Sequence, residues 1–279
     1  MRKEMSGESE KQKNTPHIRV TDLTMAYGDF VIQKDLNFTI NRGEIFIIMG
    51  GSGCGKTTLL RHLIGLKRPV KGKVYYENTS FWDVDEEERN RIMRRCGILY
   101  QGSALWSSMT LAENVALPLE EYTNLSPGDI SEIVSLKLAM VGLAGYEEFY
   151  PSELSGGMQK RAGLARAMAL DPEILFFDEP SSGLDPVSAR RLDDLILELR
   201  AGLGTTVVVV THELASIFAI GNNSIFLDAD ARTIIAQGDP HRILAETKEM
   251  RVMEFLTRGE AVAPMAEGDM EQHDNVNIG

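Results

Sequence analysis

The stretch Gly50–Thr57 constrains the fold of this chain more than any other part of the sequence. Its letters, GGSGCGKT, match the P-loop pattern G-x-x-x-x-G-K-[ST]. An apolar run at 44–49 leads into it, and a helical pattern at 58–64 follows it. In that context the glycines turn backbone N–H groups inward, and the helix N-terminus adds partial positive charge. The stretch predicts a nucleoside triphosphate site on a P-loop NTPase (RecA-like) α/β core. An ordinary glycine-rich turn would not need the Lys-Thr pair.

The residues of this loop have separate expected roles. Lys56 can reach the β- and γ-phosphates of ATP, and Thr57 can offer its hydroxyl to Mg²⁺. We expect the neighbouring positions to complete the nucleoside triphosphate-binding loop: Gly50, Gly51, Ser52, Gly53, Cys54, Gly55 and Thr58. Cys54 is also expected to be an accessible, activated thiol, because a helix N-terminus and a nearby lysine favour the thiolate.

Composition limits where such a chain can act. The 279 residues are 43% hydrophobic, which suits one large α/β domain with an insertion. The net charge of −12 argues against broad electrostatic attraction to nucleic acid. Cys54 and Cys96 have neither metal-ligand nor disulfide spacing, which suits a reducing compartment. No apolar run reaches the roughly 20 residues of a membrane helix, and the N-terminus lacks a signal-peptide core, so a membrane role requires a partner.

The first part of the chain predicts a tail and an antiparallel sheet. Residues 1–16 are polar and are expected to form a disordered N-terminal tail. Strand patterns at 18–27, 36–40 and 73–76 suggest an antiparallel β subdomain beside the nucleotide core. Tyr27 lies where this sheet could offer a ring to the adenine, and an ordinary aromatic residue at the rim is an equal alternative.

The remainder predicts a helical insertion and a buried parallel sheet. From about 102 to 169 the pattern is mainly helical, which indicates an inserted α-helical subdomain. Continuous apolar runs at 174–178 and 205–210 are typical of strands buried on both faces of a parallel sheet. A helix is expected over 242–256, and 259–279 is expected to be a flexible acidic tail after an ATPase domain at 17–258.

Carboxylates and glycines in this part carry the chemistry. Asp178 ends a buried strand, where P-loop enzymes place the carboxylate that helps hold Mg²⁺, and Glu179 can polarise a water for attack. Alternatively the pair caps the next turn. Ser155, Gly156 and Gly157 open a helix whose free N–H groups can meet an anion. Ser155 can at the same time be a simple N-cap.

Taken together, these motifs resemble an ABC ATPase over about 18–256. They occur in the family's order: Gly50–Thr57, Gln101, Leu154–Gly157, Ile174–Glu179, Ser182–Asp185 and His212. The resemblance implies that Gln101 contacts Mg²⁺ and the attacking water, and that His212 is the switch histidine. Together with Glu179 they form the expected catalytic set, and Thr57, Gln101 and Asp178 form the expected metal set.

The same resemblance assigns roles across a homodimer. It implies that Tyr27 stacks on adenine, and that Ser155, Gly156 and Gly157 contact ATP held by the opposite subunit. Asp185 would then lie between the subunits. The signature departs from the commonest family form because Met158 stands where glutamine is usual, but the anion site is formed by backbone groups.

A finer resemblance lies in 101–119 and 151–158, which look like the ATPase subunit of Mla-type (MCE) phospholipid transporters. It implies ATP-driven lipid movement through permease subunits with an MCE-domain lipid-binding protein, serving outer-membrane lipid homeostasis. The subunit would lie on the cytoplasmic face of the inner membrane. Transport of another substrate and a soluble mechanoenzyme remain alternatives, although the mechanoenzymes carry coiled coils or two cassettes per chain.

The segment after Gln101 suggests a permease contact. Leu105, Trp106, Met109 and Leu111 are large apolar residues in and after a loop, where such groups need a reason. We expect some of them to form a groove for a short permease helix. Burial in the core of the helical subdomain is the alternative.

Overall fold

The computed structural model describes residues 15–259. The predicted tails at 1–16 and 259–279 therefore lie outside the described residues except at their inner ends. Pro16, assigned to the N-terminal tail by the sequence, begins a strand.

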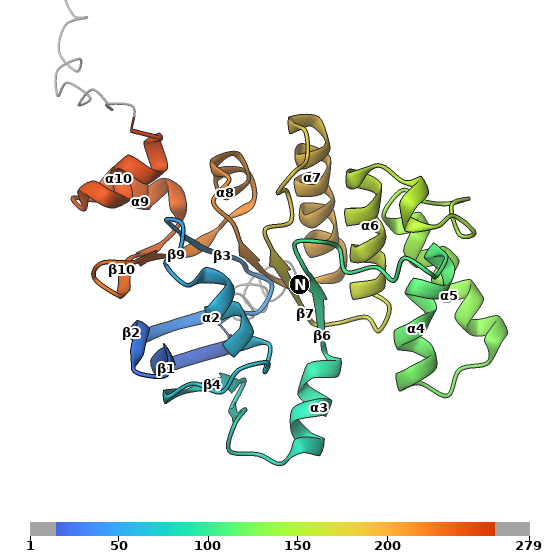
Figure 1. Ribbon diagram of the computed structural model, residues 1–279, viewed down its shortest axis with the longest axis horizontal. Coiled ribbons are helices and arrows are strands. Elements are labelled where there is room, and N and C mark those ends of the chain that lie inside the picture. The colour runs from blue at the N-terminus through green and yellow to red at the C-terminus, as the bar shows by residue number, and fades with distance from the viewer. Residues whose placement is uncertain (1–14, 260–279) are drawn as a thin grey trace, which may run out of the picture.

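A six-stranded sheet forms the centre of the molecule (Figure 1). Its order is β10-β9-β3-β8-β7-β6, and all neighbours pair in parallel except β10 with β9. The strands are β3 (Ile45–Gly50), β6 (Cys96–Leu99), β7 (Ile174–Asp178), β8 (Thr206–Val210), β9 (Asn223–Asp228) and β10 (Thr233–Gly238). The continuous apolar runs predicted this parallel core correctly, since β3, β7 and β8 are buried along their whole length.

A smaller antiparallel sheet covers one face of this core. Its order is β2-β1-β4-β5, formed by β1 (Pro16–Tyr27), β2 (Phe30–Asn41), β4 (Lys71–Tyr76) and β5 (Thr79–Ser80). β2 begins six residues before the expected strand at 36–40. The prediction began too late because Gln33 interrupts the apolar alternation. Gln33 is nevertheless fully buried, and its side-chain amide donates to the carbonyls of Cys54 and Asp228. The hairpin thus holds the back of the P-loop.

Helices cover the remaining surfaces. α2 (Lys56–Leu63) follows the P-loop, and α3 (Glu86–Arg94) precedes β6. α4 (Leu111–Tyr122), α5 (Pro127–Met140), a short 3₁₀ turn η1 (Pro151–Glu153) and α6 (Gly156–Ala167) form the helical subdomain at one side (Figure 1). α7 (Pro186–Leu203) and α8 (Leu214–Ile220) pack on the sheet. None of the helices within 15–259 has the length and apolar content needed to cross a bilayer.

The C-terminal helix expected over 242–256 is in fact two helices. α9 (Pro240–Glu246) ends at Thr247, and α10 (Met250–Thr257) begins after Glu249. Thr247 and Glu249 both have extended backbone angles, and the Thr247 hydroxyl accepts a hydrogen bond from the Glu249 N–H. Threonine favours such local bonds over the helical ladder, which explains the break.

Side-chain alternation along the strands divides the interior into two cores. Successive residues of a strand point to opposite faces. Ile45 and Ile47 of β3 therefore join the core beneath α4–α8, while Phe46 and Ile48 join the core shared with α2 and the antiparallel sheet. Because both faces are covered, the site can only open at the ends of the strands.

An ion-pair network joins the antiparallel sheet to the N-terminal ends of the parallel strands, at the edge away from the P-loop. Arg95, just before β6, donates to Glu173, just before β7, at 2.7 and 2.8 Å, and to Glu77 after β4 at 2.9 Å. Arg42 also contacts Glu173, at 3.0 Å, and Glu77. The hydrogen bonds from Arg95 hold the pKa of Glu173 at about 2, below its ordinary value of 4.5.

We expect Glu173→Gln to weaken the acid dependence of stability. Because the lower pKa belongs to the folded state, the network stabilises the fold above pH 4.5, and this contribution is lost as the pH falls towards 2. The side chain is partly exposed, so the expected loss at pH 7 is at most ~1 kcal/mol. Urea unfolding at several pH values measures it, with the exposed Glu198→Gln as control. An unchanged pH dependence in Glu173→Gln would contradict this account.

Candidate functional site

Two positions of the P-loop, Gly50 and Gly55, have backbone conformations and close neighbours that require glycine. Gly50 has φ 146°, and a Cβ there would lie 2.3 Å from the Leu227 carbonyl oxygen and 2.8 Å from the Cys54 sulfur. Gly55 has φ 99°, and its Cβ would lie 2.7 Å from Ile32. Both glycines therefore serve close approach between β9, β2 and the loop.

A cavity of about 710 Å³ lies over the P-loop at the C-terminal edge of the strands. The expected loop residues that line it are Gly50, Gly51, Ser52, Gly53, Gly55, Lys56, Thr57 and Thr58, and they are joined by Gln101, Glu179 and His212. The Lys56 ammonium donates to the carbonyls of Gly50 and Gly51 at 2.9 and 3.0 Å. The Lys56 ammonium thus lies in the cavity lining, where a polyphosphate can replace these two carbonyls as its hydrogen-bond acceptor.

Two oxygen donors meet at the base of the cavity. The Thr57 hydroxyl, at the start of α2, donates to the Asp178 carboxylate at the end of β7, at 3.0 Å. Asp178 is only 7% exposed, and burial raises the pKa of its carboxyl. A hydroxyl and a carboxylate side by side are the hard oxygen ligands that Mg²⁺ prefers, and a cation would offset the cost of burying this charge. The donor set therefore fits the metal.

Glu179 and His212 form a second pair beside the first. Glu179 follows β7 in a left-handed conformation with φ 50°, which turns its side chain into the cavity. One carboxylate oxygen lies 2.9 Å from His212 Nδ1, and the other is buried without a hydrogen-bond partner among the described residues. A buried carboxylate oxygen with free lone pairs can accept a proton from a water molecule.

Gln101 enters the cavity from the segment after β6. Its side-chain amide lies 3.5 Å from the Ser182 hydroxyl, at the limit for a hydrogen bond. Its backbone carbonyl accepts a hydrogen bond from Lys160 of α6, an ammonium only 6% exposed. Burial lowers the pKa of Lys160, while Asp178 and Glu179 act in the opposite direction. Sequence reasoning missed Lys160, since a lysine in a helix normally signals an exposed face.

Ser155, Gly156, Gly157 and Asp185 do not line this cavity. They form a second, exposed group where α6 and α7 begin. The Ser155 hydroxyl caps α6 by accepting from the Met158 N–H at 3.3 Å, and Asp185 caps α7. The two helix starts are close, because a Cβ on Gly157 would touch Ser188 at 3.4 Å. The chain thus presents two separate groups of predicted residues.

Tyr27 lies beside the P-loop helix outside the cavity lining. Its side chain is exposed, and a hydrogen bond with Thr58 lowers the pKa of its phenol. The Lys67 ammonium stands 3.0 Å from the ring centroid. The ring is therefore placed at the mouth of the site, and one face is occupied by a cation.

Known proteins share these motifs over most of the chain. A family model described as ABC transporter matches residues 33–182, which include the P-loop, Gln101, Glu179 and the signature. The chain belongs to the ABC transporter family. As a member of it, the protein is an ATP-binding subunit that hydrolyses ATP.

Individual ABC proteins are similar to this chain over most of its length. The intermembrane phospholipid transport system ATP-binding protein MlaF of Haemophilus influenzae is 39% identical over 248 residues, 89% of this chain and 92% of MlaF. The probable ribonucleotide transport ATP-binding protein mkl of Mycobacterium tuberculosis is 39% identical over 94% of this chain and 71% of mkl. The resemblance to Mla-type ATPases is confirmed.

A solved ABC structure has the same fold. The dimeric, post-hydrolysis cassette MJ0796 bound to ADP and Pi superposes with a TM-score of 0.72 at 31% identity, over 80% of this chain and 98% of that one. The predicted ABC ATPase fold, with its antiparallel and helical subdomains, is confirmed.

The expectation that Cys54 is an accessible, activated thiol is wrong. Its side chain is only 1% exposed, folded beneath Gly50. Burial raises the pKa of the thiol, and the neighbouring Lys56 offsets only part of this effect. The loop uses the backbone of Cys54, whose carbonyl accepts from Gln33.

Leu214, Phe255 and Arg258 also line the cavity over the P-loop and were not predicted. Leu214 begins α8, and the other two belong to the end of α10. No local signal in the sequence marks them, because their place depends on how the C-terminal helices pack.

We expect Cys54 to react slowly with maleimide in the folded protein. Labelling followed by peptide mass spectrometry should proceed at least about tenfold more slowly than in urea, because the thiolate is both rare and covered. MgATP should change the native rate little. Rapid native labelling that MgATP blocks would contradict the buried position.

Proposed function

We propose that this ABC ATPase powers the movement of phospholipid through a membrane permease. The observation that carries the proposal is the 39% identity to MlaF over nearly the full length of both chains. Mkl, which is named for ribonucleotide transport, is equally similar but extends further beyond the matched region. We therefore favour lipid as the cargo. Permease subunits and an MCE-domain protein are the proposed partners, with the ATPase at the cytoplasmic face of the inner membrane.

We further propose roles for the residues around the cavity. Lys56 and the P-loop N–H groups bind the phosphates, and Tyr27 stacks on the adenine. Thr57 and Asp178, with Gln101, would hold Mg²⁺, which supplies neutralisation of phosphate charge. Glu179 accepts the proton of the attacking water through its unpaired oxygen, and His212 keeps that carboxylate oriented.

The second group of residues supports a homodimer. Ser155, Gly156 and Gly157 lie at the start of α6, where the first two are exposed, and none of the three lines the P-loop cavity of its own chain. In a head-to-tail pair each such group would close the cavity of the other subunit, with Asp185 between them. The dimeric form of the similar cassette MJ0796 supports this arrangement.

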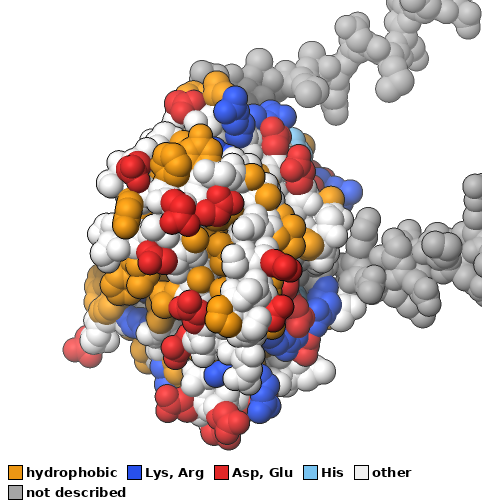
Figure 2. All heavy atoms as spheres, turned by 90° about the vertical axis from the view of Figure 1, so that its right-hand side faces the viewer, with side chains coloured by type: hydrophobic (Ala, Val, Ile, Leu, Met, Phe, Trp, Pro, Cys, Tyr) orange, Lys and Arg blue, Asp and Glu red, His pale blue; other side chains and the backbone are white. Residues whose placement is uncertain are grey.

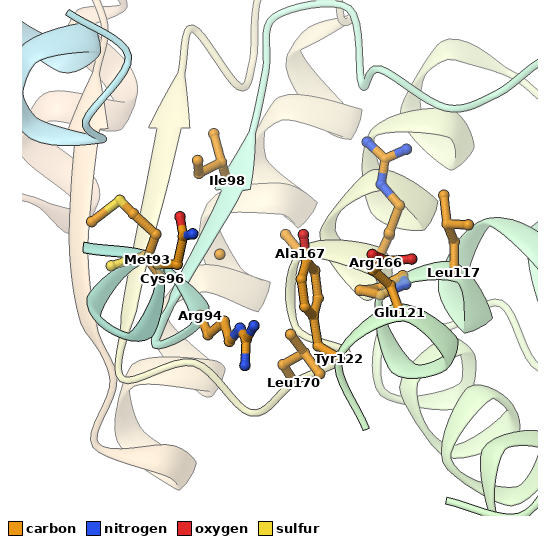
Figure 3. A pocket seen from close by; sticks show the side chains of 13 residues that line it. Met93, Arg94, Cys96, Ile98, Leu117, Glu121, Tyr122, Arg166, Ala167 and Leu170 are labelled. Atoms are coloured by element: carbon orange, nitrogen blue, oxygen red, sulfur yellow. The ribbon is translucent and has the colours of Figure 1, made fainter. Parts of the chain in front are cut away.

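A groove between the core and the helical subdomain is the proposed permease contact. The cavity, about 570 Å³, has Met93, Arg94 and Ile98 on the core side and Leu117 and Tyr122 on the α4 side (Figure 3). The Arg94 guanidinium lies over the Tyr122 ring at 4.9 Å. β6, which forms part of the wall, leads directly to Gln101. A segment seated here would contact both subdomains and the strand that enters the ATP site.

The segment expected from sequence meets this region only in part: Met109 lines an adjoining cavity of about 480 Å³, and Leu117 lines both cavities. Leu111 is fully buried in the helical core, while Leu105 and Met109 are half-buried. Trp106 is 58% exposed but does not line the groove. The outer side of the helical subdomain carries hydrophobic side chains among Asp and Glu (Figure 2). Cytoplasmic loops of membrane proteins are rich in Lys and Arg, which suits such a surface.

We expect Glu179→Gln to keep ATP binding and lose most turnover. The change removes the proton acceptor but keeps size, and general bases contribute at least about 100-fold to rate. Phosphate release measures turnover, and calorimetry measures ATP affinity. Lys56→Ala should instead weaken binding, and Glu198→Gln should change neither. Near-normal turnover in Glu179→Gln would remove this residue as the base.

We expect Leu117→Glu to abolish binding to the permease while leaving the basal ATPase of the isolated subunit largely intact. A charge buried in an apolar contact costs several kcal/mol unless it is paired. Co-purification from detergent-solubilised membranes measures the contact, and lipid transfer measures its consequence. The matched control is Leu136→Glu on α5, exposed and outside the groove. Normal co-purification of a folded Leu117→Glu protein would place the contact elsewhere.

A further inference from the structure

The C-terminal helix α10 forms one wall of the ATP cavity. Phe255 and Arg258 line it together with the P-loop, although they lie about two hundred residues further along the chain. Among the described residues that line the cavity, Lys56 and Arg258 alone carry lysine or arginine charges. Arg258 is thus one of these two cationic side chains, and it belongs to none of the motifs named in the sequence analysis.

α10 is firmly attached next to the P-loop strand. Val252 and Leu256 are buried, and the Phe255 ring packs edge-on against Phe226 of β9 with centroids 5.1 Å apart. β9 pairs in parallel with β3, the strand that leads into the P-loop. The helix that carries Arg258 therefore packs against the same sheet that leads into the P-loop.

Ion pairs near the start of α10 also attach this helix to the end of β9. Arg251 of α10 contacts Asp228 at 2.7 Å and Asp230 at 3.2 Å. Asp228 is 7% exposed, and its carbonyl accepts from Gln33, which also holds the Cys54 carbonyl. A chain of direct contacts thus runs from α10 to the back of the P-loop.

The helix end gives Arg258 a defined backbone position. Arg258 is the C-cap of α10 in the left-handed conformation, with φ 55°. The next N–H, of Gly259, closes the turn on the Glu254 carbonyl at 2.8 Å. A left-handed residue is a common way for a helix to end, and here it fixes where the Arg258 side chain leaves the backbone.

The Arg258 guanidinium has a weak ionic partner. It lies 3.9 Å from a Glu213 carboxylate oxygen, and the other Glu213 oxygen lies 3.8 Å from His212 Nε2. Arg258 is 69% exposed in its side chain, so this contact is long and hydrated. A polyphosphate in the cavity can compete for the guanidinium, since arginine matches phosphate oxygens with two parallel N–H donors.

We propose that Arg258 is a further phosphate-binding residue, with which α10 distinguishes ATP from ADP. When ATP binds, the partner of the guanidinium changes from Glu213 to the phosphates. The attraction between Arg258 and the nucleotide grows with the negative charge of the nucleotide, so the triphosphate gains the most affinity. The proposal rests on the proposed placement of ATP in this cavity, and it adds the C-terminal helix to the elements that respond to nucleotide.

Calorimetry with the full chain tests this proposal. The ligands are MgADP and the Mg²⁺ complex of a non-hydrolysable β,γ-imido analogue of ATP. Arg258→Ala should weaken the triphosphate analogue about three- to tenfold and ADP less than about twofold. Arg258→Lys should recover most of the loss, and added salt should reduce the difference between wild type and Arg258→Ala.

The matched control is Arg190→Ala, because Arg190 is 71% exposed and, within residues 15–259, forms its one ion pair with Asp194 of the same helix. It should bind both ligands like the wild type. Equal affinities of Arg258→Ala and wild type, or an equal loss for both nucleotides, would overturn the proposal. Absence of nucleotide binding in the wild type would instead overturn the proposed placement of ATP. A thermal unfolding midpoint for each variant confirms that the compared proteins are folded.

Discussion

Parallel pairing of β8 with both β3 and β7 is the constraint on which the nucleotide site depends. Ile48 and Asp178 are both in register with Val210, so the P-loop, the acidic pair and His212 leave the sheet at the same edge. The ladder continues past the strands, since the Glu179 N–H donates to the Val210 carbonyl at 2.8 Å. The contact between Thr57 and Asp178 follows from this register rather than from local sequence, and a shift by one residue would break it.

The C-terminal edge of the parallel sheet contains buried charged groups. A bound nucleotide with its metal would offset the free-energy cost of burying them. Asp178 is buried with a raised pKa, Glu179 has an unpaired oxygen, and Lys160 is a buried ammonium beside them. Buried charges are normally tolerated only when they are paired or serve function. Lys160 also connects α6, the helix that begins after Ser155, to the backbone carbonyl of Gln101 in the cavity lining.

The sequence predicted those parts of the site that have a local signal. The P-loop, Asp178 and Glu179 each stand at the end of an apolar run. In the structure the P-loop and Glu179 line one cavity, and Asp178 accepts a hydrogen bond from Thr57 of that cavity. Cys54 was mispredicted because its burial depends on the packing of β9 against Gly50, which no local pattern reveals. Arg258 was missed because its place depends on α10 and a distant ion pair at Asp228. Long-range packing, rather than propensity, decided both cases.

The composite ATP site that we propose requires a second copy of the chain to complete each P-loop cavity. Mixing two inactive variants tests it most directly: Lys56→Ala, defective in the P-loop, and Gly156→Asp, which places a charge at the signature. A Cβ on Gly156 meets nothing closer than Leu184 at 3.8 Å, so this variant should fold. The account predicts that each variant alone lacks ATPase activity and that the mixture regains it, because mixed dimers contain one intact composite site. A mixture as inactive as its components, with mixed dimers demonstrably present, would contradict it.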